Sequence, residues 1–239
     1  PATFKTGDSK AKSFSFVHVS DTQVATADEH PLHSAIGTGA AFGKTLEGIK
    51  KSNPNPAFLL HTGDIVQNVH EPYWRSMIDD NNKYLSNVPF MAASGNHEAS
   101  GTDAILNHFN FNAPEQDTSK GLYYYFDYGD ARFIVLNTNL LDGTSKISQS
   151  QYNWLKRTLE SNTKKWTIVS MHNPIYSVGK WVQDEELNAT SLKLRDQLFK
   201  VFARYNVDLV LQGHDHTYSK TYPISVEGKA DLEAKYETI

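Results

Sequence analysis

The sequence predicts an α/β fold in which strands and helices alternate. Short apolar runs, rich in Val, Ile, Leu and aromatic residues, recur along the 239-residue chain between turn residues, as buried strands do. Segments with apolar residues at intervals of three and four separate several of these runs, which is the spacing of amphipathic helices. Such alternation favours largely parallel strand pairing. The apolar runs cover residues 14–20, 57–62, 88–93, 122–128, 132–137, 166–171 and 207–212.

Four segments between the runs are expected to be helical. In "SQSQYNWLKRTLESN", Ser148 is expected to cap the N-terminus of the third helix, because a serine side chain can accept a hydrogen bond from the first turn. The apolar positions of the four segments are Phe42, Leu46 and Ile49; Trp74, Ile78 and, less regularly, Leu85; Tyr152, Leu155 and Leu159; and Leu194, Leu198, Val201 and Phe202.

One pair of strands breaks the parallel pattern. In "YYYFDYGDARFIVLN", Gly129 and Asp130 separate two apolar runs by a tight turn. A glycine-containing turn of this length joins antiparallel neighbours. We therefore expect a hairpin here, and a mixed sheet around it.

Composition excludes several classes of protein. Hydrophobic residues make up 39% and aromatic residues 12% of the chain, as in globular rather than disordered proteins. The net charge of −4 argues against a nucleic-acid partner, and no apolar stretch is long enough for membrane insertion. The absence of cysteine excludes thiol catalysis and structural cysteine–zinc sites.

The chain is expected to contain one domain, residues 14–223. The polar, aperiodic residues 1–13 are interpreted as a linker or N-terminal extension, and residues 224–239 as a C-terminal extension. Because the chain starts at Pro1 rather than Met, and its last residues show no clear domain closure, we expect a piece of a longer protein. The sequence leaves the oligomeric state open.

Polar residues cluster just after the predicted strands, at the ends where α/β proteins build their sites. Glycines at positions 63, 95 and 213 allow the sharp turns that bring such side chains to a common point. Carboxylate, amide and imidazole groups suit Mn, Fe, Zn or Ni rather than metals that prefer thiolates, and one carboxylate can contact two metals. The residues are Asp21, Asp64 in "GD", Asn96 and His97 in "GNHE", His172 in "MHNP", and His214 and His216 in "GHDH".

Together these elements resemble the calcineurin-like metallophosphoesterases, whose signature is D-x-H, GD, GNH[ED], a lone His and GHxH. All but the His of the first element stand here in the same order, over residues 14–223. "YYYFDYGDARFIVLNTN", "QYNWLKRTL", "MHNPIYS" and "GHDHTYSKTYP" resemble one branch, the purple acid phosphatases. The resemblance implies a four-layer αββα sandwich of two mixed sheets flanked by helices, and a metallophosphoesterase catalytic domain.

The resemblance also implies a role for each residue. Two divalent metal ions, Mn, Fe or Zn, would be held at the strand ends and would supply a metal-bound hydroxide nucleophile. His97 would face the phosphate as the catalytic acid or transition-state stabiliser, with Asn96 beside it, and Glu98 would orient His97 or a ligand histidine. The implied ligands are Asp21 and His216 for metal 1, Asn96, His172 and His214 for metal 2, and Asp64 as the catalytic bridge.

The chain departs from the family pattern at two positions. Gln23 stands where most of the family has the His of D-x-H, and Gln67 stands where purple acid phosphatases have a tyrosine, three residues after the bridging Asp64. Gln23 is expected to give metal 1 at most a weak amide oxygen, or to be an unremarkable surface residue. Without a phenolate, ferric iron loses a favoured donor. We therefore expect a divalent pair, or one tight and one loose site.

The metal ligands also have structural alternatives. His214 and His216 are alternatively hydrogen-bonded histidines at a strand end, and Asp21 and Asp64 are alternatively turn formers or helix caps. His97 is alternatively a residue that supports the site without contacting substrate. These alternatives lose weight when the ordered series is taken together.

Other residues near the predicted site have less specific signals. Tyr176 either lines the substrate pocket or packs against its neighbours. His18 and His61, each three residues before a ligand aspartate, are expected to be strand residues with hydrogen-bonding roles. The loops 21–40 and 177–190 are expected to shape the substrate pocket.

The resemblance implies hydrolysis of a small phosphorylated substrate, with a phosphomonoester favoured and a phosphodiester open. The alternatives are a non-catalytic metal- or phosphate-binding domain of a larger surface protein, and a domain that senses metal or phosphate without turnover. By analogy with exported phosphatases, we expect the protein to be secreted or at the cell surface.

Overall fold

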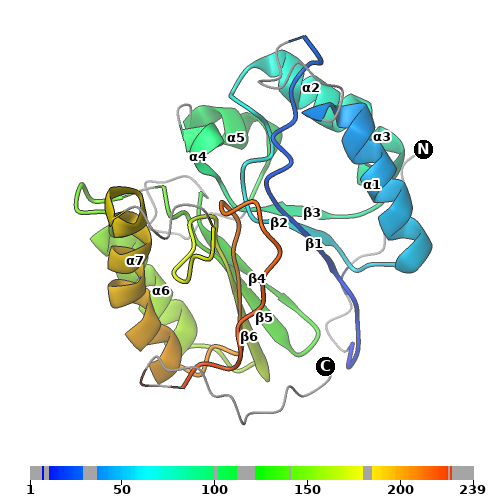
Figure 1. Ribbon diagram of the computed structural model, residues 1–239. Coiled ribbons are helices and arrows are strands. Elements are labelled where there is room, and N and C mark those ends of the chain that lie inside the picture. The colour runs from blue at the N-terminus through cyan, green and yellow to red at the C-terminus, as the bar shows by residue number, and fades with distance from the viewer. Residues whose placement is uncertain are drawn as a thin grey trace.

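Two β-sheets packed face to face form the centre of the protein (Figure 1). The computed structural model describes residues 7, 11–28, 37–99, 102–111, 122–139, 141–179, 185–225 and 227. The first sheet has the order β1-β2-β3 and the second the order β4-β5-β6-β7. The strands are β1 (Val17–Val19), β2 (Leu59–His61), β3 (Phe90–Ala92), β4 (Tyr124–Tyr128), β5 (Ala131–Val135), β6 (Trp166–Ser170) and β7 (Leu209–Leu211).

The strand pairing is parallel except at one hairpin, as predicted. β1, β2 and β3 pair in parallel, and so do β5, β6 and β7. β4 and β5 are antiparallel, and Tyr128 pairs with Ala131 across the turn at Gly129. Gly129 has a φ of 54°, which a glycine adopts without steric cost. The carboxyl ends of the parallel strands in each sheet therefore lie at one edge.

Helices cover the outer face of each sheet. In Figure 1, α1, α2 and α3 flank the first sheet, and α6 and α7 flank the second. The predicted cap of α6 is confirmed, because the Ser148 side chain accepts a hydrogen bond from the backbone N–H of Gln151. The helices are α1 (Gly39–Ser52), α2 (Glu71–Asp79), α3 (Asn82–Leu85), α4 (Asn96–Ala99), α5 (Thr102–His108), α6 (Gln149–Glu160) and α7 (Glu185–Arg204).

Three hydrophobic cores lie between the four layers. Along β2, Leu59 packs toward the helices of the first sheet and Leu60 packs between the sheets, because successive side chains of a strand point to opposite faces. β5 alternates likewise, with Phe133 between the sheets and Ile134 toward α6 and α7. Strands buried on both faces explain the continuous apolar runs in the sequence. The predicted four-layer α/β sandwich is confirmed.

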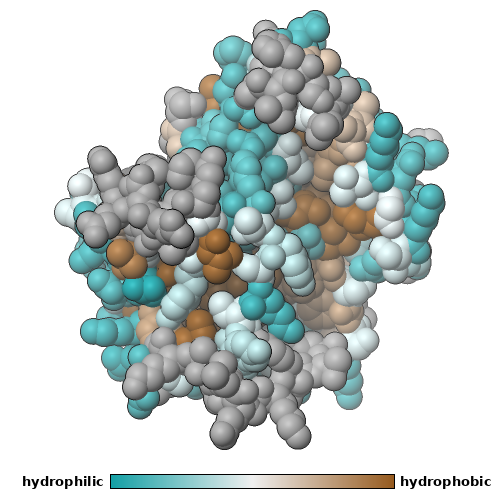
Figure 2. Space-filling view, viewed as in Figure 1, coloured by the Kyte–Doolittle hydropathy of each residue, from teal (hydrophilic) through white to brown (hydrophobic). Residues whose placement is uncertain are grey.

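The surface seen in Figure 2 is more hydrophilic at its edges than at its middle. On the face shown in Figure 2, the outer edges are largely hydrophilic, and hydrophobic residues show mainly toward the middle of the view. Within the described residues, the helices lack an apolar span long enough to cross a bilayer. The proposed extensions, residues 1–13 and 224–239, lie mostly outside the described residues.

We predict that Phe133→Ala lowers the free energy of unfolding by about 3–5 kcal/mol, because truncating a buried aromatic leaves a cavity. Phe133 is fully buried, and its ring lies 5.0–5.2 Å from those of Phe16, Phe58 and Phe126. Urea denaturation followed by circular dichroism measures the effect. The control is Tyr218→Ala, whose side chain is 98% exposed. A loss no larger for Phe133→Ala than for the control would contradict the assignment of the inter-sheet core.

Candidate metal centre

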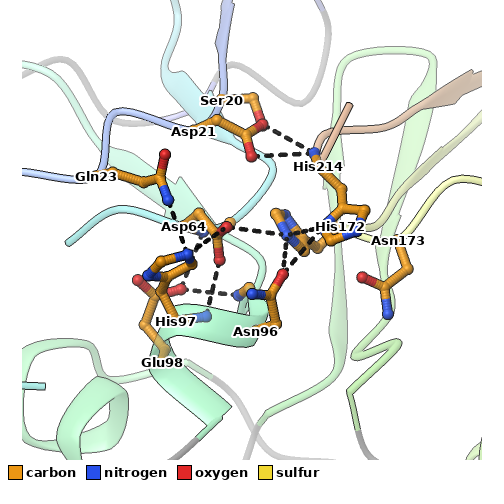
Figure 3. A network of polar contacts seen from close by, with 12 residues as sticks. Ser20, Asp21, Gln23, Asp64, Asn96, His97, Glu98, His172, Asn173 and His214 are labelled. Atoms are coloured by element: carbon orange, nitrogen blue, oxygen red, sulfur yellow. Dashed lines mark hydrogen bonds and ion pairs between the residues drawn. The ribbon is translucent and has the colours of Figure 1, made fainter. Parts of the chain in front are cut away.

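The predicted ligands converge where the carboxyl ends of strands from both sheets meet (Figure 3). Asp21 follows β1, Asp64 follows β2, and Asn96 begins α4 after β3. The second sheet contributes His172 after β6, and His214 and His216 after β7. The six side chains come from five strand ends, with His214 and His216 sharing the segment after β7, so the rigid sheets set the distances between them.

The ligand atoms form two groups that share one residue. Asp64, His172 and His214 make one group, and Asp21, Asp64 and His216 make the other. Within each group the candidate ligand atoms lie within 4.8 Å of one another. This division coincides with the two sites that the family resemblance implied, with Asp64 common to both.

The hydrogen bonds of the first group direct several acceptor atoms toward one point. His172 Nδ1 lies 2.9 Å from the carbonyl oxygen of Thr62, which only accepts, so Nδ1 carries the proton. The lone pair of the neutral ring, on Nε2, then faces Asn96 Oδ1 at 3.0 Å and Asp64 Oδ2 at 3.3 Å. His214 Nδ1 lies 2.9 Å from the same Asn96 oxygen. Such a set of converging acceptors needs a metal ion or a proton between them, and therefore fits a metal.

Charge coupling in the metal-free protein supports this interpretation. Burial opposes a charge on His172, but the Asp64 carboxylate outweighs burial and raises the pKa of His172. Burial also opposes ionisation of Asp64, but the hydrogen bonds and charges of His172 and His97 together lower the pKa of Asp64. Burial, followed by the charge of His172, lowers the pKa of His214. The negative charge of Asp64 thus favours a positive charge beside it, which a bound cation would supply.

The backbone is strained at these positions. Five non-glycine residues of the site have positive φ angles between 42° and 73°, namely Asp21, Gln23, Asp64, His214 and His216. The left-handed conformation costs roughly 1–2 kcal/mol for a residue with a side chain, and such strain persists where surrounding contacts hold it and is concentrated at functional sites. Here the contacts include hydrogen bonds from the backbone N–H of His214 to the carboxylate of Asp21.

Glu98 holds the loop that carries Asp64. Its buried carboxylate accepts hydrogen bonds from the backbone N–H groups of Asp64 at 3.0 Å, Gly95 at 2.8 Å and Val66 at 3.1 Å. We expected Glu98 to orient a histidine, but the structure shows it bonded to backbone amides. Burial, and then the charge of Asp64, raise the pKa of Glu98 to about 7.

Gly95 permits the close approach of these segments. A Cβ at this position would lie 2.0 Å from Asp64 Oδ1 and 2.1 Å from the Asp64 backbone nitrogen. Only glycine therefore allows the loop after β3 to contact the proposed bridging residue. We predicted that Gly95 allows a sharp turn of the backbone. The close approach of Asp64 is a second reason why a side chain does not fit at this position.

His18 and His61 have the hydrogen-bonding roles that we predicted. His61 Nδ1 accepts from the backbone N–H of Gly63, and His61 Nε2 lies 3.0 Å from the Thr22 hydroxyl, which donates to the Ile65 carbonyl. His61 is therefore a neutral ring that links the loops after β1 and β2. Burial, and then the neighbouring His18 and His172, lower the pKa of His61 to about 3. His18 Nε2 contacts the Thr62 hydroxyl at 3.1 Å.

His97 faces the centre without belonging to either ligand group (Figure 3). Its Nε2 lies 3.7 Å from Asp64 Oδ2, and its backbone N–H donates to Asp64 Oδ1 at 2.9 Å. His97 Nδ1 contacts the backbone carbonyl oxygen of Gln67, and His97 Nε2 contacts the side-chain nitrogen of Gln23. Gln23 thus turns its amide nitrogen toward His97, a contact that neither of the two alternatives for Gln23, a weak ligand of metal 1 or an unremarkable surface residue, included.

Tyr176 has the contacts of a packing residue. Its ring lies 6.2 Å from Phe199 in an edge-on arrangement, and the Arg195 guanidinium lies 5.4 Å from its centre. Both partners belong to α7. Of the two alternatives for Tyr176, these contacts favour packing over a place in the substrate pocket.

Sequence reasoning missed Asp215, the residue between the two histidines of "GHDH". Its carboxylate accepts hydrogen bonds from the hydroxyl of Ser177 and the backbone N–H groups of Val178 and Gly179. Asp215 therefore holds the start of the loop after β6 beside the metal ligands. An acidic residue between two candidate ligands was the available signal. Residues 29–36 and 180–184 of the two predicted substrate loops lie outside the described residues.

Comparison with known sequences agrees with this geometry. A family model described as calcineurin-like phosphoesterase matches residues 14–218. Purple acid phosphatase 21 of Arabidopsis thaliana is 32% identical over 194 residues, covering 76% of this chain and 42% of that protein. "Probable inactive purple acid phosphatase 1" of the same plant is 29% identical, covering 77% and 32%. Rat serine/threonine-protein phosphatase CPPED1 is 29% identical, covering 72% and 57%.

Solved structures show the same fold. Purple acid phosphatase PPD1 from yellow lupin seeds superposes with a TM-score of 0.72 at 23% identity, covering 92% of this chain and 41% of that one. PhoD superposes with a TM-score of 0.59 at 14% identity, covering 89% and 53%. This chain spans between 32% and 57% of the relatives described here.

We predict that His61 makes the metal-free protein sensitive to acid. The folded-state pKa of about 3 lies below the ordinary value of 6.5, so the unfolded chain binds a proton first, and stability is lost as pH falls through 6.5. Between pH 7 and pH 5 the wild type should lose roughly 2 kcal/mol more than His61→Gln, which cannot titrate there. Urea denaturation at each pH measures the difference, and parallel pH curves would contradict it.

We also predict that the two cations bind with unequal affinity. His172 is completely buried, whereas the His216 side chain is 55% exposed. Among the described residues each group has three carboxylate or histidine ligands, and the Asn96 oxygen adds a fourth contact to the group of His172. In manganese titrations by calorimetry, His172→Ala should weaken the tight step by more than about a hundredfold, since even outer contacts to ligands are worth 10–100-fold. His216→Ala should weaken only the looser step. Loss of the tight step in His216→Ala would contradict this order.

Proposed function

The chain belongs to the calcineurin-like phosphoesterase family, and on that premise we propose that it hydrolyses phosphate esters at a pair of divalent cations. One observation carries this proposal: the two ligand groups share the buried Asp64 carboxylate, and His97, which belongs to neither group, faces the same point. Ligands without His97 would suit storage or structure, whereas His97 adds a group that can transfer a proton.

Each residue of the site has a separate role in the proposed hydrolysis. When bound, two divalent cations neutralise phosphate oxygens and lower the pKa of a coordinated water. Asp64 would hold both cations, and Glu98 holds the backbone of Asp64 in place. When Nε2 of His97 also carries a proton, it would stabilise charge on the phosphate or protonate the leaving oxygen. Asn96 is proposed to serve both metal 2 and the phosphate.

We propose that the substrate is a small phosphomonoester, with a phosphodiester as the second candidate. Similarity to proteins named purple acid phosphatases supports the monoester. A glutamine in place of the branch's tyrosine, at position 67, supports a divalent pair of Mn, Fe or Zn rather than a pair that includes ferric iron. The same branch resemblance supports a secreted or cell-surface location.

A non-catalytic metal- or phosphate-binding domain is the alternative function. A relative that is 29% identical has the name "Probable inactive purple acid phosphatase 1", and the glutamines at positions 23 and 67 depart from the family pattern. Both ligand groups and His97 are nevertheless present and converge. Their convergence favours catalysis.

We predict that His97→Ala lowers kcat by about 10²–10⁴-fold, the usual contribution of a general acid, while the protein keeps its metal. Manganese-, iron(II)- and zinc-loaded protein would be assayed with p-nitrophenyl phosphate and bis(p-nitrophenyl) phosphate, and metal would be measured by elemental analysis. His70→Ala, on an exposed residue before α2, is the matched control. Metal binding without turnover of either ester would instead support the non-catalytic alternative.

A further inference from the structure

Both glutamines that depart from the family pattern contact His97, Gln23 through its side chain and Gln67 through its backbone carbonyl, which any residue at position 67 could supply. The Gln23 side-chain nitrogen lies 2.7 Å from His97 Nε2, and the Gln67 carbonyl oxygen contacts His97 Nδ1. We propose that Gln23 is a positioning residue for His97 and not a ligand of metal 1. This inference rests on the proposed function, because it assigns a role at the same site.

The hydrogen-bond chemistry sets the direction of each contact. The Gln67 carbonyl oxygen is an acceptor only, so His97 Nδ1 must donate to it. Nε2 of the neutral ring then holds a lone pair and accepts a hydrogen bond from the Gln23 amide nitrogen. Figure 3 shows this nitrogen facing the ring and the Gln23 oxygen directed away from it. Two bonds at opposite ring nitrogens select one tautomer and one ring orientation.

The backbone keeps both partners of His97 in register. The Gln23 N–H donates to the Asp64 carbonyl at 2.9 Å, and the Gln67 N–H donates to the Val24 carbonyl at 2.9 Å. Val24 and Val66 form a parallel bridge between these contacts. The segments after β1 and β2 therefore continue their pairing beyond the strands, and together they flank the His97 ring on α4.

The backbone conformation of Gln23 is energetically unfavourable, and the hydrogen bond to His97 offsets part of this cost. Its φ of 42° lies in the left-handed region, where a residue with a side chain is disfavoured. In that conformation the side chain reaches His97 across the site. A ligand role would require the amide oxygen to turn toward metal 1, and the hydrogen bond to His97 Nε2 would then be lost.

The amide also suits a residue that transfers a proton. Glutamine carries a donor and an acceptor on one rotatable group, so it can pair with Nε2 in either protonation state. A histidine that binds metal 1 has its ring nitrogen occupied and cannot do this. The exchange of histidine for glutamine at position 23 therefore leaves metal 1 with Asp21, Asp64 and His216, and gives His97 a partner.

The test is Gln23→Ala in the metal-loaded full chain, with three readouts. Manganese content should stay at the wild-type value, and kcat for p-nitrophenyl phosphate should fall about tenfold with a smaller change in KM, because an unheld ring spends less time in the productive orientation. The ¹⁵N chemical shifts of His97 in the zinc-loaded protein should move from the Nδ1–H tautomer toward a mixture. Gln149→Ala, on the outer surface of α6, is the matched control and should leave all three unchanged.

A double variant separates positioning from a general structural effect. If Gln23 acts through His97, Gln23→Ala should lower kcat no further in the His97→Ala background. A fall in manganese content in Gln23→Ala would overturn the proposal in favour of a ligand role. Unchanged ¹⁵N shifts would overturn it as well. If the wild type shows no turnover, the proposed function fails, but the metal content and the ¹⁵N shifts still decide whether Gln23 positions His97.

Discussion

The proposed metal centre depends on one shared carboxylate. Two divalent cations a few ångströms apart repel each other strongly, so a pair forms only where a negative group is held between them. Asp64 is the single residue common to both ligand groups, and its side chain is almost completely buried. Its position in turn requires a glycine at position 95 and the three hydrogen bonds that Glu98 accepts.

The residues around Asp64 act mainly on the backbone. Glu98, His61 and Asp215 each bind amide groups of the loops that follow the strands. Of the left-handed residues of the site, Asp64 lies in one of these loops, and the other four lie in the segments after β1 and β7. Tertiary contacts therefore offset the local backbone strain. The hydrophobic cores between the sheets and helices stabilise the fold enough for the strained residues to persist. The ligands stay in place because the strand ends from which they extend cannot move independently.

The sequence was sufficient to predict the strands and the longer helices, because their apolar residues recur with a regular period or form continuous runs. The predicted strands were found because both faces of each sheet are covered, which makes the strands apolar throughout. α4 and α5 were not predicted, because helices of four and seven residues are too short to display a period. The backbone amides that Glu98 and Asp215 bind could not be predicted either, because any residue type supplies a backbone amide. Strand-end placement indicated which residues would meet, but not which atom of Gln23 would face His97.

Anomalous X-ray scattering from crystals of the manganese-loaded protein tests the shared-carboxylate centre most directly. We predict two peaks per chain, one on each side of the Asp64 carboxylate. One peak should lie against His172 and His214, and the other against Asp21 and His216. A single peak, or two peaks that do not share Asp64, would contradict the dinuclear centre on which the proposed hydrolysis depends.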